Sequence, residues 1–189
     1  EAFTIMSRAR AQIRRPLDSR AQVSISVVDT NGSVLGLVRS PDAPIFGIDV
    51  SLQKARTAAF FSNAKAAAEI AANPDPLVSA RIAKARTFFG DNNAFTGQTA
   101  WSNRAIGNIS RPYFPDGEVA RAPGPFSPGI ESFSPFNTGI QSDLVFGNIA
   151  THVGALLNGT ADTPQRCTAM PDVVAGQNRL QNGIQIFPG

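Results

Sequence analysis

Two reactive side-chain types occur only once each in this sequence: one histidine, His152, and one cysteine, Cys167. A single cysteine excludes an internal disulfide framework, and a single histidine excludes a metal site built from several imidazoles. Cys167 has one basic neighbour, Arg166, which is too little positive charge to predict a reactive thiolate. Neither His152 nor any other residue belongs to a recognisable acid–base pair, so the sequence offers little chemistry for an enzyme.

A second group of candidates lies on one predicted helix, which carries Lys54, Arg56 and Thr57. Lys54 and Thr57 are three residues apart and share a helix face, whereas Arg56 points about 200° away from Lys54. These side chains suit contact with an anionic ligand such as a small carboxylate. The alternative is structural: Lys54 or Arg56 forms an ion pair with a carboxylate such as Asp29 or Asp49 and holds the helix to a hairpin.

Charge and composition limit the classes of function. The net charge is +3, and residues 1–20 hold five arginines against two carboxylates. A solvated helix face is the expected explanation, because no aromatic residues interleave with these arginines as stacking platforms for nucleic acid, so nucleic-acid binding is not predicted. Hydrophobic residues make up 42% of the 189 residues, and no apolar run approaches the ~18 residues of a membrane span. The composition therefore predicts one domain with a real core and no membrane span.

The clearest signal among the elements that must position these candidates is a β-hairpin. Val23, Ile25 and Val27 alternate with serines, and Asn31-Gly32 supplies a turn in which both residues tolerate positive φ. We expect the hairpin to pack against the helix that carries the basic candidates. The predicted ranges are 22–29 and 33–39 for the strands and 49–62 for the helix.

Further helices follow from apolar spacing and from capping signals. Thr138 with Gln141 three positions on matches a capping box, and Asn158-Gly159 is a usual helix end. The predicted ranges are 2–14, 64–72 and 77–89, then a helix from Thr138 with the apolar stripe Ile140, Leu144, Val145, Ile149, Val153, Leu156 and Leu157, and finally a short strand at 183–187.

Residues 90–137 differ in composition from the rest, because proline and glycine are frequent there. Disordered segments are poor in aromatic residues, whereas this one is rich in phenylalanine. We therefore expect an ordered, largely irregular insertion that is anchored to the core or to a neighbouring subunit. The expected anchors are Phe114, Phe126, Phe133 and Phe136.

Several of these features together resemble one protein family. The stretch Val27 to Gly32 (VVDTNG), then Leu35 to Arg39, Asp42-Ala43 and Ile48 to Phe61 (IDVSLQKARTAAFF) are similar to the GlcG/HbpS family, which also includes the C-terminal domain of PduO. With the first helix included, the resemblance covers residues 1–63. It implies an α/β (α+β) fold with a profilin-like or PAS-like antiparallel sheet flanked by helices. The long insertion and the missing closing strand are departures from the family pattern.

The resemblance also carries expectations about function. It implies haem binding, assembly into homo-oligomers and a periplasmic or secreted location in a bacterium. It adds Arg39 to Lys54, Arg56 and Thr57 as predicted ligand-binding residues, and it makes His152 a candidate haem ligand, with a half-buried residue on the border of the stripe as the alternative. We expect a non-catalytic ligand-binding or assembly subunit. The alternatives are a haem-degrading or small-acid-processing enzyme and a purely structural oligomer component.

The two ends of the sequence carry one more expectation. The chain opens on Glu1 within an amphipathic pattern and closes on Ile186-Phe187-Pro188-Gly189, which is typical of a strand running into a turn. We expect residues 1–189 to form a single domain that is incomplete at both ends. Because proteins rarely leave a sheet edge open, we also expect a cleaved C-terminal fragment of the same protein, or a neighbouring subunit, to pair beside residues 184–187.

Overall fold

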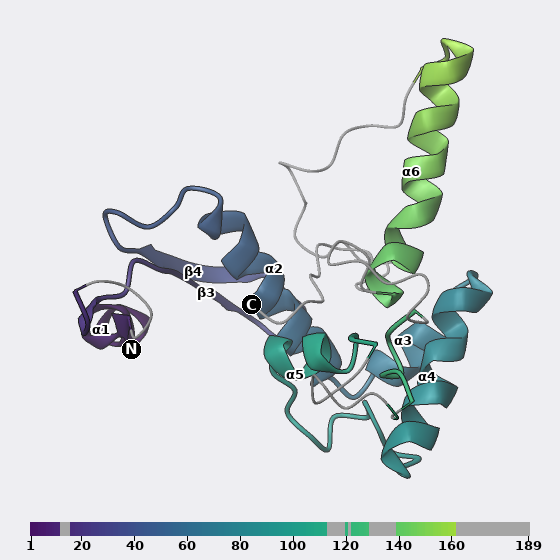
Figure 1. Ribbon diagram of the computed structural model, residues 1–189, viewed down its shortest axis with the longest axis horizontal. Coiled ribbons are helices and arrows are strands. Elements are labelled where there is room, and N and C mark those ends of the chain that lie inside the picture. The colour runs from purple at the N-terminus through teal and green to yellow at the C-terminus, as the bar shows by residue number, and fades with distance from the viewer. Residues whose placement is uncertain (12–15, 113–119, 121, 129–138, 162–189) are drawn as a thin grey trace.

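The computed structural model describes residues 1–11, 16–112, 120, 122–128 and 139–161 (Figure 1). Some of the features predicted from the sequence lie outside these ranges. They are Phe114, Phe133, Phe136, Thr138, Cys167 and the strand at 183–187.

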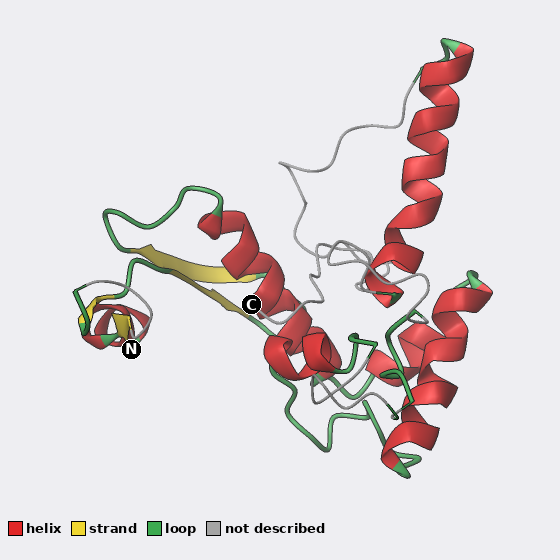
Figure 2. Cartoon of the chain, viewed as in Figure 1, coloured by secondary structure: helices red, strands yellow, loops and turns green. Residues whose placement is uncertain are grey.

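A two-stranded hairpin and one long helix form one part of the fold (Figure 2). Strand β3 (Ser24–Val28) pairs antiparallel with β4 (Val34–Arg39), and α2 (Gly47–Phe61) lies mainly over β3. The predicted hairpin and its packing against a helix are confirmed. The serine face of β3 meets the helix, because Ser26 Oγ lies 2.7 Å from Ser51 Oγ. Small serine side chains allow a close approach here, and the two hydroxyls form one hydrogen bond, while Ser51 also donates to the Ile48 carbonyl.

The N-terminal helix is shorter than predicted. Helix α1 (Ala2–Arg8) ends at Ala9, whose backbone is extended, and the chain continues into β1 (Arg10–Ala11), which pairs with β2 (Ser19–Arg20). The prediction of helix over 2–14 is therefore wrong at residues 9–11, and residues 12–14 lie outside the described ranges. The Ala9 carbonyl accepts a hydrogen bond from the Ala21 N–H at 3.0 Å, so sheet-like pairing replaces the next helical turn.

Strand pairing in the described ranges forms two separate two-stranded sheets, β1–β2 and β3–β4. The fold class shown is accordingly α+β, with helices and a small antiparallel sheet. The finer expectation of a profilin-like or PAS-like sheet stays a prediction.

Three helices continue the chain beyond α2: α3 (Ala66–Ala71), α4 (Pro76–Phe89) and α5 (Asn103–Asn108). Helix α4 has favourable ends, since the Asp75 side chain accepts from the Leu77 N–H at 2.8 Å and Gly90 closes it in the left-handed region. Helix α5 begins where Ser102 Oγ accepts from the Ala105 N–H. Part of the region expected to be irregular therefore forms a capped helix.

The core is aromatic, and part of it comes from beyond residue 90. Phe61, Phe95 and Phe126 are 0%, 2% and 0% exposed, and their ring centroids lie 5.5–5.6 Å apart. Phe126 is the only one of the four expected anchors within the described ranges, and its predicted burial is confirmed. The segment around it is thus integrated into the core.

Two glycines allow the backbone around Phe126 to pack against its neighbours. The Phe126 N–H donates to the Ile109 carbonyl, and the Ile140 N–H donates to the Phe126 carbonyl, both at 3.1 Å. A Cβ on Gly124 would lie 2.1 Å from the Ile109 carbonyl oxygen, and one on Gly139 would lie 2.0 Å from the Phe126 carbonyl oxygen. Only glycine fits these two positions, and Gly139 also has a φ of +64°.

Helix α6 (Ile140–Asn158) starts later than predicted and leaves the body of the protein (Figure 1). Gly139 is its N-cap residue, one position after the predicted Thr138, whose side chain lies outside the described residues, and the Ile140 N–H donates to the Phe126 carbonyl. Only the first turns of the predicted apolar stripe are buried, at Ile140 and Leu144. The exposed members are Ile149, Val153, Leu156 and Leu157. Gly159 ends the helix in the left-handed region, as predicted.

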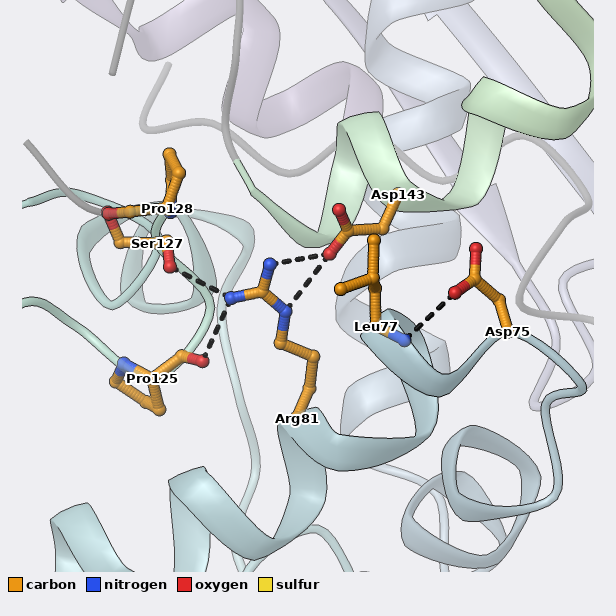
Figure 3. Close-up of polar contacts among 7 residues, drawn as sticks. All are labelled: Asp75, Leu77, Arg81, Pro125, Ser127, Pro128 and Asp143. Carbon is orange, nitrogen blue, oxygen red and sulfur yellow. Dashed lines mark hydrogen bonds and ion pairs between the residues drawn. The ribbon is translucent and has the colours of Figure 1, made fainter. Parts of the chain in front are cut away.

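A buried arginine fastens α6 to α4 (Figure 3). The Arg81 guanidinium donates from Nη2 and Nε to Asp143 Oδ2, at 2.5 and 3.1 Å. Its Nη1 donates to the Ser127 carbonyl at 2.8 Å and lies 3.5 Å from the Pro125 carbonyl oxygen. One side chain on α4 therefore holds both α6 and the chain near Phe126.

Two carboxylates drawn in Figure 3, those of Asp143 and Asp75, predict different losses of stability. Asp143→Ala leaves the Arg81 charge buried without its partner, so we expect the free energy of unfolding to fall by about 3 kcal/mol. Asp75→Ala removes only a helix cap and should cost about 1 kcal/mol. Urea unfolding of both variants and of the parent protein measures the two losses. Equal losses would contradict the assignment of Arg81–Asp143 as the stronger contact.

Candidate functional site

Arg56 connects α2 to the turn of the hairpin. It is 5% exposed, and its Nε donates to the Gly32 carbonyl at 2.8 Å. Gly32 has a φ of +88°, and a Cβ there would lie 3.3 Å from Arg56 Cγ. Gly32 therefore leaves room for the Arg56 side chain and accepts its hydrogen bond. This contact fixes where α2 lies along the hairpin.

Asp29 stabilises the same turn from within. Its Oδ1 accepts from the Asn31 and Ser33 N–H groups at 2.8 and 2.9 Å. These backbone donors, Ser33 first and Asn31 second, lower the pKa of the Asp29 carboxyl, because they stabilise its charged form. Because the pKa of Asp29 is lower in the folded state than in the unfolded state, the Asp29 carboxylate stabilises the fold at pH values above its unfolded-state pKa. This stabilisation is lost as the pH falls through the folded-state pKa.

Two other predicted ligand residues also make structural contacts. Thr57 has no exposed surface, and its hydroxyl donates to the Gln53 carbonyl at 2.9 Å. Arg39 ends β4, at the opposite end of the hairpin from the turn, and donates from Nη2 to the Ala43 carbonyl. Its Nε has no hydrogen-bond partner among the described residues. Whether Arg39, Arg56 and Thr57 also contact a ligand stays a prediction.

Lys54 also lies on α2, which contacts α5. Burial of its side chain, and in second place the positive charge of Arg104 on α5, lower the pKa of the Lys54 ammonium group. Both effects disfavour the charged amine. A bound anion would offset this cost, so the pair suits a ligand with a carboxylate or phosphate group.

Sequence reasoning selected Lys54 but missed Arg104. Arg104 lies in the region expected to be irregular, and only Ser102 ahead of it indicated a helix start. Its closeness to Lys54 depends on the packing of α5 against α2, which no local pattern reveals.

His152 lies on α6, away from the hairpin and α2 in the chain, and its side chain is half-buried. Helix α6 packs against α4. The predicted residues are thus distributed over three elements, β4, α2 and α6. Within the described ranges, no three histidine, cysteine or acidic residues gather in a way that would hold a metal ion. None of the described helices combines the length and hydropathy needed to cross a membrane.

Comparison with known families decides how the chain is classified. A family model described as "Haem degrading protein HbpS-like" matches residues 1–107, more than half of the chain. The chain belongs to the HbpS-like family. The resemblance noted in the sequence over residues 1–63 is therefore confirmed and extended, and the HbpS-like segment contains both Lys54 and Arg104. No curated protein and no solved structure was found to match.

The HbpS-like segment does not contain its whole core. Phe126 and Ile140, both without exposed surface, lie beyond residue 107 and pack in the same apolar cluster as Phe61. The elements that carry the basic pair are consequently supported in part by residues outside the family match.

The charge on Lys54 gives a testable consequence. We expect the amine of Lys54 to titrate below the ordinary lysine range, and Arg104→Gln to raise its pKa part of the way back, because burial is the larger cause. NMR titration of the lysine side chains resolves this, since the chain has only three lysines. Arg20→Gln, at an exposed arginine on β2, is the control and should leave the titration unchanged. An ordinary pKa for Lys54 would refute the proposed closeness of the two cations.

Proposed function

We propose that this HbpS-like protein is a non-catalytic subunit that binds haem, with Lys54 and Arg104 holding the haem carboxylates. The observation that carries the proposal is the half-buried Lys54, whose pKa is lowered by burial and then by the positive charge of Arg104, within the family segment. The family description supports a haem-related role. The cationic pair supports the chemical detail, because haem carries two carboxylates on an otherwise apolar ring.

The other predicted residues take different parts in this proposal. Arg56 positions α2 through its contact with Gly32, whereas the described contact of Thr57 is to Gln53 within α2 itself. Arg39 offers an Nε that has no partner among the described residues, so it is the candidate for a further polar contact. His152 remains the candidate axial ligand, as the only imidazole in the chain. When bound, haem would supply a redox-active iron.

The proposal of a binding subunit rather than an enzyme comes from the residues. General acid–base chemistry needs a positioned proton donor and acceptor, and the sequence pattern offers one histidine and no acid–base pair. The family description favours the second candidate, a haem-degrading enzyme. We further propose, from the family resemblance, a periplasmic or secreted homo-oligomer.

Titration with hemin tests the proposed site. We expect a Soret band that shifts and saturates on binding, and a dissociation constant about tenfold weaker for Lys54→Gln, which loses one charge-assisted hydrogen bond. The matched control is Lys84→Gln, because Lys84 is exposed on α4 and is also followed by Ala-Arg-Thr. Equal affinities for the two variants would exclude Lys54 from the site, and the absence of a saturable Soret change would exclude haem.

A second measurement separates binding from catalysis. With ascorbate and oxygen present, we expect the Soret band of haem bound to a non-catalytic subunit to fade no faster than that of a protein-free hemin control. Faster loss of the band, with biliverdin-like absorbance appearing, would establish the enzyme and overturn the non-catalytic proposal.

A further inference from the structure

Helix α6 has two apolar sides, and only one of them is covered. Ile140, Leu144 and Ala155 are at most 8% exposed. On the other side, large apolar side chains are exposed. These are Phe146 (67%), Ile149 (54%), Val153 (44%), Leu156 (67%) and Leu157 (81%). At about 100° per residue, this set lies within roughly 100° of arc, centred about 180° from Leu144. We call these five side chains the outer face of α6.

The outer face is large for a surface left in water. At ~150–250 Å² per large side chain, these exposed fractions correspond to on the order of 600 Å² of apolar surface. A monomeric protein seldom exposes a contiguous patch larger than about 300–600 Å², and a standard protein interface buries about 800 Å² on each partner. The outer face is thus close to the size that a protein partner would cover.

The spacing of the outer face suits another helix. Phe146, Ile149, Val153 and Leu156 follow one another at intervals of three, four and three residues, which is the a and d spacing of a coiled coil. This register places Phe146 and Val153 at a positions and Ile149 and Leu156 at d positions, so every seam position is apolar, as helix–helix pairing requires.

The charge pattern favours an identical helix as the partner. No aspartate, glutamate, lysine or arginine occurs from Leu144 to Asn158. Two copies of α6 can therefore approach without repulsion between like charges. A charged partner, by contrast, would lose hydration without gaining an ion pair. The face also lies outside the HbpS-like segment, which ends at residue 107.

We propose that α6 is a self-association surface, and that two copies of this chain pair through the outer faces of their α6 helices. This contact is independent of haem binding. Its occupant is a second copy of the chain; the chain's own C-terminal residues and a lipid surface are the competing occupants that the experiment distinguishes.

Analytical ultracentrifugation of the full chain at ~10–100 μM tests the proposal through two neighbouring residues on opposite sides of α6. We expect Leu156→Lys to halve the mass of the assembly relative to the parent protein, and the matched control Asn158→Lys to leave it unchanged. Val153→Lys is a second disruptive variant. Circular dichroism checks that all variants keep the helical content of the parent.

A photo-crosslinker provides a test that does not depend on disruption. Benzoylphenylalanine in place of Phe146 should give a band at twice 19.9 kDa whose linked peptides both come from α6, and in place of Asn158 it should not. A monomeric parent protein, a mass unaffected by Leu156→Lys, or crosslinks only within one chain would overturn the proposal. Sedimentation of a monomeric parent with phospholipid vesicles would point to a lipid surface instead.

Discussion

The fold depends on the burial of one ring, that of Phe61 at the end of α2. It contacts the rings of Phe60, Phe95 and Phe126, with centroids 5.1, 5.5 and 5.6 Å away. These neighbours come from α2 itself, from the loop before α5 and from beyond the HbpS-like segment. A fully buried phenylalanine contributes about 3–5 kcal/mol relative to alanine, which is a large fraction of the stability of an ordinary domain.

The position of the basic pair follows from this packing. Phe61 fixes one end of α2 in the aromatic core, and Arg56 fixes the same helix to the hairpin turn through the Gly32 carbonyl. With both contacts in place, α2, which carries Lys54, is held in contact with α5, which carries Arg104. The position of the basic pair therefore depends on the packing of Phe61 and on the contact of Arg56 with the hairpin turn.

Local signals explain what could be predicted from the sequence. The hairpin followed from alternation and from Asn31-Gly32, and α4 followed from apolar spacing bounded by prolines and a glycine. The N-terminal helix was predicted too long, because apolar spacing persisted beyond Arg8 while pairing between β1 and β2 ended the helix.

Long-range contacts explain what could not be predicted. The N-cap of α6 was misplaced because Phe126, 14 residues earlier, supplies the carbonyl that satisfies the Ile140 N–H. Arg104 beside Lys54 and Arg81 beside Asp143 also join elements far apart in the chain. The predicted α6 stripe divides between two sides of the helix: Ile140 and Leu144 are buried, and Ile149, Val153, Leu156 and Leu157 are exposed on the opposite side. Spacing did not tell which side packs against the core.

The central claim is that residues beyond 107 complete the core that holds α2 and its basic pair in place. Hydrogen exchange followed by mass spectrometry tests it most directly, because Phe126 and Ile140 donate their amide hydrogens inside that core. The account predicts that peptides containing these two amides are protected as strongly as the peptide that contains Phe61, so that all three open together. Rapid exchange at Phe126 and Ile140, with protection retained around Phe61, would show that the HbpS-like segment folds without them and would contradict the account.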